Sequence, residues 1–211
     1  MTTFSDSFTG TDGDNLETRS GWTKCTGGSG DTLGINSNHV VAEARNGFQA
    51  YYNSAAATVD QDVQKVTQVV SSGKDSLSPC ARLNTAGSNC YFFRFSGGVW
   101  TLYKRVGGTI TGIGTYTGDV PTGAGRVGLL RVTDAAKKLL VDGVERISSA
   151  DNAVTAAGNF GLATYYGELA ANAYSDDYSA TDAAAASVVG PLIHDARLIG
   201  GGILVKGRLA A

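Results

Sequence analysis

Two groups of acidic residues are the first candidates for chemistry in this sequence. Asp12, Asp14 and Asn15 stand at close intervals in a glycine-containing segment, and carboxylate and amide oxygens at alternate positions suit a hard cation such as Ca²⁺. The other ligands of a full EF-type loop are missing, so turn chemistry is the favoured interpretation of this segment. Asp176 and Asp177 form the second group. If the two groups meet in the fold, they repel each other unless hydrogen bonds or a structural Ca²⁺ offset the repulsion, and no other cofactor is expected.

A third group of residues has the composition of a sugar-binding site. Small-molecule sites are concave and combine aromatic rings with a few well-placed polar groups. The residues that could supply this combination are Arg94, Tyr103, Tyr165 and Tyr166. No clear aromatic ladder accompanies them, which counts against a sugar-binding function.

The cysteines and histidines do not form a recognisable catalytic or metal-binding pattern. Cys25, Cys80 and Cys90 make an odd number with no metal-type spacing. Cys80 and Cys90 flank a short turn and could lie near each other, but a chain made in the cytosol keeps its thiols reduced, so buried free thiols are expected. His39 and His194 sit in different regions without a nucleophile motif. We therefore expect no catalytic histidine.

The stretch Asn89–Val106 must position Arg94 and Tyr103. Two aromatic, β-prone runs flank the pair Gly97-Gly98, and a two-residue type I′ turn requires positive φ at both central residues, so a hairpin is predicted. One face of this hairpin is purely apolar and the other is mixed, as in a central hairpin that covers a core with one side. The predicted cross-strand pairs are Phe95 with Trp100, Phe93 with Leu102, Arg94 with Thr101 and Phe92 with Tyr103.

The rest of residues 1–182 reads as a series of short strands. Phe4–Phe8 alternates apolar and polar residues and predicts an opening strand, and Asp142-Gly143 predicts a second hairpin. Residues 62–72 fit both a helical stripe and strand alternation, and their β-branched residues favour a strand. Turn signals recur about every ten residues. The predicted fold is all-β, a two-sheet antiparallel jelly-roll sandwich with a short C-terminal appendage.

Composition and charge exclude several classes of partner. The chain has 211 residues, of which 42% are hydrophobic, and a net charge of −2. This balance gives no argument for nucleic acid or for an acidic membrane surface. No apolar run approaches the roughly 20 residues of a membrane span. The N-terminal residues have neither a basic nor an apolar segment of the signal-peptide kind, so synthesis in the cytoplasm without a signal peptide is expected.

Residues 183–211 differ from everything before them. The segment opens with an alanine run, has no aromatic residue and contains Gly200–Gly202. Three basic residues against one acid give it a net charge of +2, whereas residues 1–182 carry −4. It is too short for a core of its own, so an assembly or anchoring tail is expected. The residues expected to make the anchoring contacts are Leu192, Ile193, Arg197, Leu198, Ile199, Ile203, Leu204, Val205, Lys206, Arg208 and Leu209.

The order of these pieces resembles the concanavalin A-like, or LamG-like, jelly-roll superfamily over roughly residues 4–182. The matching stretches are FSDSFTG (4–10), CARLNTAGSNCYFFRFSGGVWTLYKRVGG (80–108), GRVGL (125–129), LLVDGVE (139–145), GNFGL (158–162) and YSDDYSATD (174–182). The resemblance implies that the first and last strands lie side by side. Small stand-alone members with C-terminal tails look like bacteriophage virion proteins, including capsid decoration and tail accessory proteins.

The resemblance also bears on catalysis. The glucanase branch of the superfamily carries closely spaced acids, E-x-D-x-x-E or a variant, on one strand, and glycoside hydrolysis needs two carboxylates about 5–10 Å apart. No such triplet occurs here, and the neighbours Asp176 and Asp177 point to opposite faces if they lie on a strand. We therefore expect no enzyme. The expected function is a bacteriophage virion structural protein that docks on other virion proteins and forms a homo-oligomer. The alternative is a non-catalytic carbohydrate-binding module for host-surface glycans.

Overall fold

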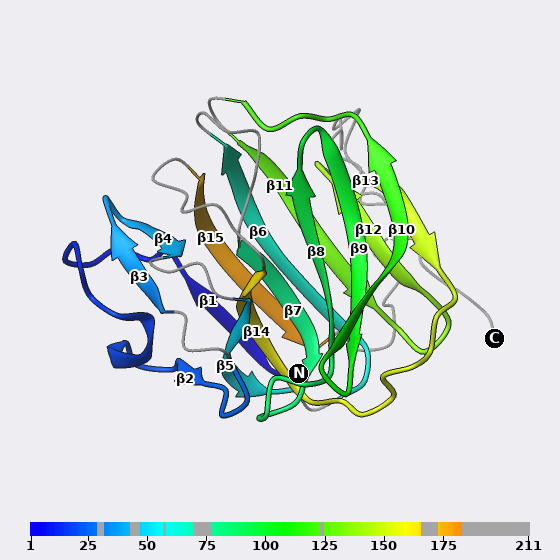
Figure 1. The fold of residues 1–211 in the computed structure, drawn as a ribbon, viewed down its shortest axis with the longest axis horizontal. Coiled ribbons are helices and arrows are strands. Elements are labelled where there is room, and N and C mark those ends of the chain that lie inside the picture. Colours follow the sequence, from blue (N-terminus) through cyan, green and yellow to red (C-terminus); the bar gives the residue numbers. More distant parts are fainter. Residues whose placement is uncertain are drawn as a thin grey trace, which may run out of the picture.

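Two antiparallel sheets lie face to face in the computed structural model of this chain (Figure 1). The structure describes residues 1–28, 32–42, 47–56, 58–69, 77–122, 125–165 and 173–182. Within these ranges the one helical element is the three-residue 3-10 turn Leu16–Thr18, and no helix is long and apolar enough to span a membrane. The all-β jelly-roll prediction is confirmed.

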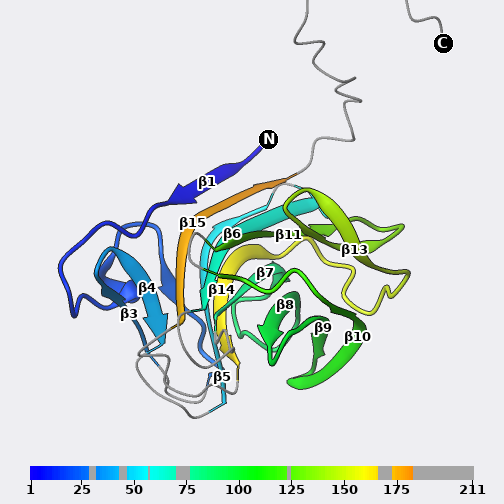
Figure 2. The same cartoon turned by 90° about the horizontal axis from the view of Figure 1, so that it is seen from above.

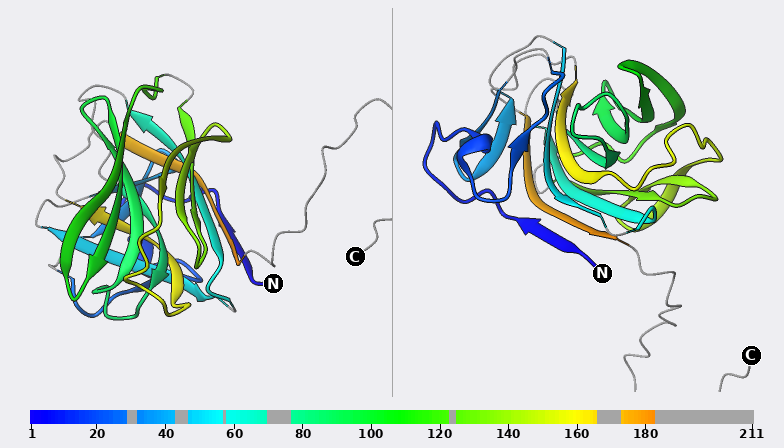
Figure 3. Two further views of the ribbon diagram at one scale, coloured as in Figure 1. Left: turned by 90° about the vertical axis from the view of Figure 1, so that its right-hand side faces the viewer. Right: turned by 90° about the horizontal axis from the view of Figure 1, so that it is seen from below.

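We name the two layers sheet A and sheet B, and Figure 3 shows them stacked on each other. In spatial order, sheet A consists of β13 (Val144–Ser149), β12 (Lys137–Val141), β11 (Arg126–Val132), β6 (Gln61–Val69), β15 (Ala173–Asp182), β4 (His39–Ala42) and β3 (Leu33–Asn36), with β1 (Thr3–Asp6) also paired to β15. Sheet B consists of β10 (Thr109–Thr117), β9 (Val99–Val106), β8 (Cys90–Ser96), β7 (Leu77–Leu83), β14 (Asn159–Tyr165), β5 (Phe48–Ala55) and β2 (Thr23–Lys24).

The first and last strands are neighbours, as the resemblance implies. β1 and β15 run antiparallel, with Thr3 opposite Thr181 and Asp6 opposite Tyr178. The blue β1 lies along the orange β15 in Figures 1 and 2. An aromatic group closes this corner of the core, because the ring of Trp22 lies 5.4 Å from that of Phe4 and 5.2 Å from that of Tyr178.

The central hairpin has the predicted register. Gly97 and Gly98 have φ values of 59° and 84°, so both adopt the left-handed conformation that a type I′ turn requires. The pairs are Phe95 with Trp100, Phe93 with Leu102, Arg94 with Thr101 and Phe92 with Tyr103. The second hairpin also forms, with β12 and β13 joined at Asp142-Gly143, and residues 61–69 are the strand β6 rather than a helix.

The core between the sheets is filled by one face of this hairpin and its partners. Phe93, Phe95, Trp100 and Leu102 are all 0% exposed. A Cβ atom at Gly128 of β11 would stand 2.4 Å from the ring of Phe93, so only glycine lets the two sheets approach here. The sequence pattern, which placed these residues on the apolar face, therefore located the core correctly.

Sheet B is curved. In Figure 2 its strands bend from β5 through β14, β7 and β8 to β10, so the face turned away from sheet A is concave. We call this the concave face. It carries a second apolar cluster, separate from the main core, to which Phe48, Cys80, Cys90 and Phe92 contribute buried side chains.

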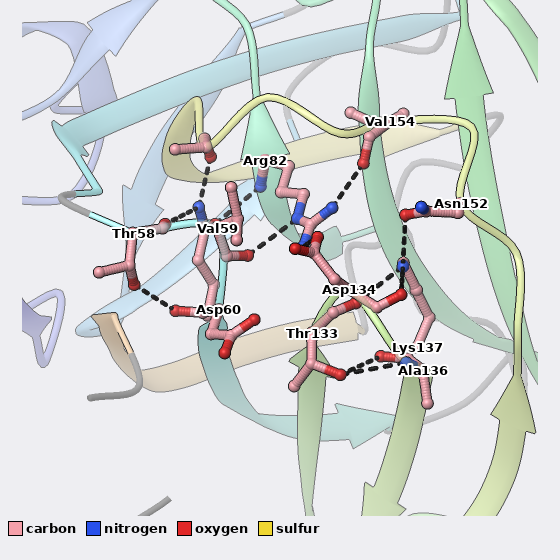
Figure 4. A network of polar contacts seen from close by, with 12 residues as sticks. Thr58, Val59, Asp60, Arg82, Thr133, Asp134, Ala136, Lys137, Asn152 and Val154 are labelled. Carbon is pink, nitrogen blue, oxygen red and sulfur yellow. Dashed lines mark hydrogen bonds and ion pairs between the residues drawn. The ribbon is translucent and has the colours of Figure 1, made fainter. Parts of the chain in front are cut away.

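A network of polar contacts lies at one end of the sandwich (Figure 4). The side chain of Arg82 is 0% exposed, and its guanidinium donates to Val59 O at 2.8 Å, Val154 O at 2.7 Å and Asp134 Oδ1 at 2.8 Å. Arg82 itself has a φ of 53°, so the chain is held in a left-handed conformation at this buried cation. A strained backbone position persists only where the surrounding contacts determine it, and these three hydrogen bonds do so.

Lys137 is a second buried cation in the same network. Its ammonium donates to Thr133 O at 2.7 Å and to Asn152 Oδ1 at 3.1 Å. Burial, together with the nearby positive charge of Arg82, lowers the pKa of Lys137. Carbonyl and amide oxygens rather than carboxylates satisfy most of these donors, which is how buried charge is tolerated at this end of the fold.

Tyr91 joins β8 to the segment after β13. Its hydroxyl donates to Asp151 Oδ1 at 2.8 Å and accepts from the Val154 N–H at 3.1 Å. Lys104 forms an ion pair with the same carboxylate. Burial raises the pKa of Tyr91 from 10.0 to about 12.

Alkaline pH is therefore expected to destabilise the protein through Tyr91. The Tyr91 hydroxyl loses its proton near pH 10.0 in the unfolded chain and near pH 12 in the folded chain. Its contribution to the free energy of unfolding is therefore fully present below pH 10 and is lost as the pH rises from 10 to 12. Urea unfolding of the wild type and of Tyr91→Phe at several pH values measures the effect. The free energy of unfolding should fall more steeply above pH 10 in the wild type, and parallel curves would contradict the assignment.

Candidate functional site

The concave face brings together three of the four residues predicted to bind a sugar. Arg94 on β8, Tyr103 on β9 and Tyr165 at the end of β14 are all half-buried. The guanidinium carbon of Arg94 lies 5.6 Å from the centre of the Tyr165 ring. The rings of Tyr103 and Tyr165 are 5.5 Å apart and inclined at 70°. Tyr166 lies outside the described residues.

Strand alternation explains how these side chains reach one face. Phe93 points into the core, so its neighbours on β8, Phe92 and Arg94, point to the concave side. Tyr103 stands directly opposite Phe92 and must share that side. Tyr165 belongs to β14, which is the strand next to β7 in the spatial order of sheet B.

Buried aromatic rings pack against Tyr103 and Tyr165. Phe92 stacks on Tyr103 with the ring centres 5.0 Å apart and 13° between the planes. Phe48 lies 5.4 Å from Phe92, and the guanidinium of Arg105 covers Phe48 at 4.1 Å. The sequence could have identified Phe92 as a neighbour of Tyr103, because the hairpin register places the two residues opposite each other. It could not have identified Phe48, because β5 carries no local signal of its pairing with β14.

The charges of sheet B are all of one sign. Its described strands contain no Asp or Glu, whereas Arg94 and Arg105 come from β8 and β9. These strands therefore do not supply the two carboxylates that glycoside hydrolysis requires. A cluster of two tyrosine rings and one guanidinium offers stacking surfaces and hydrogen-bond donors, which suits the binding of a small polar ligand.

The two predicted acidic groups lie on β15 of sheet A and in the segment after β1. Asp12 accepts a hydrogen bond from the Ser37 N–H at 2.6 Å, and the side chain of Asp14 accepts one from the Thr11 N–H at 3.2 Å. Asp176 lies 3.8 Å from Nε2 of His39. The backbone hydrogen bonds offset part of the negative charge of Asp12 and Asp14.

A calcium ion at these acids stays a prediction. Within the described part of the chain, no three His, Cys, Asp or Glu side chains are grouped closely enough to hold a metal ion. Asn15 precedes the 3-10 turn in extended conformation and makes no side-chain capping bond to it. Asp177 has a φ of 46° at an irregularity of β15.

The three cysteines are free and buried. They meet in the second apolar cluster, behind the aromatic rings of the concave face. Burial raises the pKa of the Cys25 thiol to about 12 and that of Cys80 well above its usual value. Protonated, buried thiols of this kind are unreactive, which agrees with the expectation of plain buried thiols.

Solved structures share this fold. No protein-family model matches the sequence, and no curated protein matches it. The carbohydrate binding module CBM66 from Bacillus subtilis has a TM-score of 0.58 at 15% identity, covering 75% of this chain and 92% of the module. The exoplasmic/lumenal domain of VIP36, in its Ca²⁺/Man2-bound form, has a TM-score of 0.60 at 11% identity, covering 86% and 88%. A point mutant of the carbohydrate recognition domain of Emp46p has a TM-score of 0.55 at 10% identity, covering 77% and 88%.

The chain has a jelly-roll, lectin-like fold. At these identities the likeness concerns the fold alone. None of the three structures is described as a virion protein, so the virion role, its partners and the homo-oligomer stay predictions. The anchoring residues between Leu192 and Leu209, and His194 with them, lie outside the described residues, and so does the whole of the predicted tail.

Proposed function

We propose that this chain is a non-catalytic carbohydrate-binding domain and that the concave face of sheet B holds the sugar. The observation that carries the proposal is the meeting of Arg94, Tyr103 and Tyr165 from three different strands. The centre of the Tyr165 ring lies 5.6 Å from the guanidinium carbon of Arg94 and 5.5 Å from the centre of the Tyr103 ring. Tyr103 and Tyr165 supply rings for the apolar side of a sugar. Arg94 supplies hydrogen-bond donors for its hydroxyl or carboxylate oxygens.

The rigidity of the site supports binding. Tyr103 is stacked on the fully buried Phe92, and Phe92 is held by Phe48. Side chains fixed by packing lose little conformational entropy when a ligand binds. The sugar-binding domains with the same fold, among them one solved in a Ca²⁺/Man2-bound form, support the same assignment.

A glycan array followed by calorimetry with the strongest glycan tests the proposal. We expect Tyr103→Ala and Tyr165→Ala each to weaken binding by about tenfold or more, since central aromatic residues dominate binding free energies. The matched control is Tyr116→Ala, which removes a half-buried tyrosine from the other face of sheet B, where Tyr116 packs against the main core.

The control separates a lost contact from a general loss of stability. Tyr116→Ala should bind as the wild type does, within about twofold, provided that circular dichroism shows all three variants folded. The proposal is wrong if no glycan binds, or if the two concave-face variants bind as tightly as the control.

A further inference from the structure

A trough crosses the outer face of sheet A, on the opposite side of the molecule from the concave face. It consists of two adjoining depressions of about 520 and 510 Å³, both of which are lined by Ser5, Gln64 and Ser179. The first depression extends across four strands, from β1 to Leu129 and Arg131 of β11. The surface is mixed, with hydroxyl and amide groups around the half-exposed Leu129.

The charges around the trough are mainly negative. Asp6, Asp62 and Asp177 line it, and Arg131 is the one basic side chain among its lining residues. Two of these acids are already paired, Asp62 with Arg131 and Asp6 with Arg19, each at 2.7 Å. Asp177 is the lining acid that forms no ion pair with a basic residue in the described part of the chain. An occupant that places apolar side chains on Leu129 and one basic side chain beside Asp177 would therefore complement this surface.

The chain leaves the described part of the fold beside this trough. Ala180 and Thr181 line the first depression, and β15 ends one residue later. The Asp182 N–H donates to Thr2 O at 3.1 Å, which fixes the point of departure against the start of β1. Residues 183–211 follow, with a net charge of +2.

We propose that the chain's own C-terminal segment, Ser187–Ile199, docks in this trough. The four alanines before it can span about 13 Å when extended, enough to turn back over the residues that line the trough. The segment offers the apolar side chains of Val188, Val189, Leu192 and Ile193 to Leu129. Its charges balance, with Arg197 against Asp195, and Arg197 is the basic side chain that it offers to Asp177. A tethered segment binds at a high effective concentration, so its own trough is favoured over that of a second copy.

Hydrogen exchange of the full chain, followed by mass spectrometry, tests the docking. In the wild type, amides of residues 188–199 should exchange at least about tenfold more slowly than in a random coil. Leu129→Lys should remove this protection. The matched control is Val127→Lys, which places the same charge two residues away on the same strand and face, at a 39% exposed position outside the trough.

Exchange of the β8 amides reports in the same experiment whether each variant is folded. Exchange of residues 188–199 at the random-coil rate in the wild type would overturn the proposal. So would equal loss of protection in both lysine variants. Protection that appears only with a dimer in analytical ultracentrifugation would also overturn it, in favour of the tail of a second copy. Glycan binding on the concave face is measured separately and does not depend on this result.

Discussion

Replacing Phe93 with alanine is expected to lower the free energy of unfolding by about 3–5 kcal/mol. Phe93 is 0% exposed, and its ring reaches across the core to Gly128 of the opposite sheet. Removing the ring leaves a cavity between two sheets that cannot both move inward, since Trp100 and Leu102 hold the surrounding space. The expected loss is a large share of the ~5–15 kcal/mol that stabilises a typical domain.

Urea unfolding measured by fluorescence and circular dichroism gives this number. Arg94→Ala is the matched control, because Arg94 is the next residue on the same strand and lies on the concave face, half-buried. Its loss should be within about 1 kcal/mol. Equal losses in the two variants would contradict the assignment of the two faces, since a one-residue shift in register exchanges them.

The second large effect is expected at the buried cation Arg82. Arg82→Met should lower the free energy of unfolding by about 2–4 kcal/mol, because it leaves the carbonyl oxygens of Val154 and Val59 without their donor and each orphaned buried acceptor costs about 1–3 kcal/mol. The change leaves Val59 O, Val154 O and Asp134 without the guanidinium that now serves all three. Methionine and arginine are equally strained at a φ of 53°, so backbone strain does not contribute to the difference in stability between the variant and the wild type.

Arg131→Met provides the control for Arg82. Arg131 also pairs with an aspartate, Asp62, but its side chain is 45% exposed. The Asp62 side chain is 15% exposed, so the pair is partly open to solvent and should contribute about 1 kcal/mol. This variant should therefore unfold nearly as the wild type does in urea. If Arg82→Met cost no more than Arg131→Met, the network in Figure 4 would be no more important to stability than a surface ion pair.

The parts of the fold that were predictable are those with local signals. Gly97-Gly98 and Asp142-Gly143 each define a hairpin, and the alternation around the first pair fixed the register of β8 and β9. The pairing of β5 with β14 places Phe48 opposite Tyr165, although the two residues are far apart in the sequence. No local sequence pattern predicts this pairing. The left-handed, buried Arg82 was equally hidden, because a lone arginine in a strand usually indicates an exposed face.

The candidate site was predictable to the extent that it follows from the hairpin. Arg94 and Tyr103 come from adjacent strands in a known register, so their common face could be deduced. Their meeting with Tyr165 depends on the order of sheet B, which places β14 beyond β7. The guanidinium of Arg105 covers the ring of Phe48, so the role of Arg105 at the site depends on the position of β5, which carries Phe48.

The pairing of the terminal strands determines how the molecule would respond to mechanical tension. Thr3 stands opposite Thr181, so a force that pulls the two ends apart acts on one end of the β1–β15 ladder. In an antiparallel pair loaded in this way, the hydrogen bonds break one after another rather than together. β1 would therefore peel away first, uncovering Phe4 and Trp22, while the strands that carry Tyr103 and Tyr165 would remain in place.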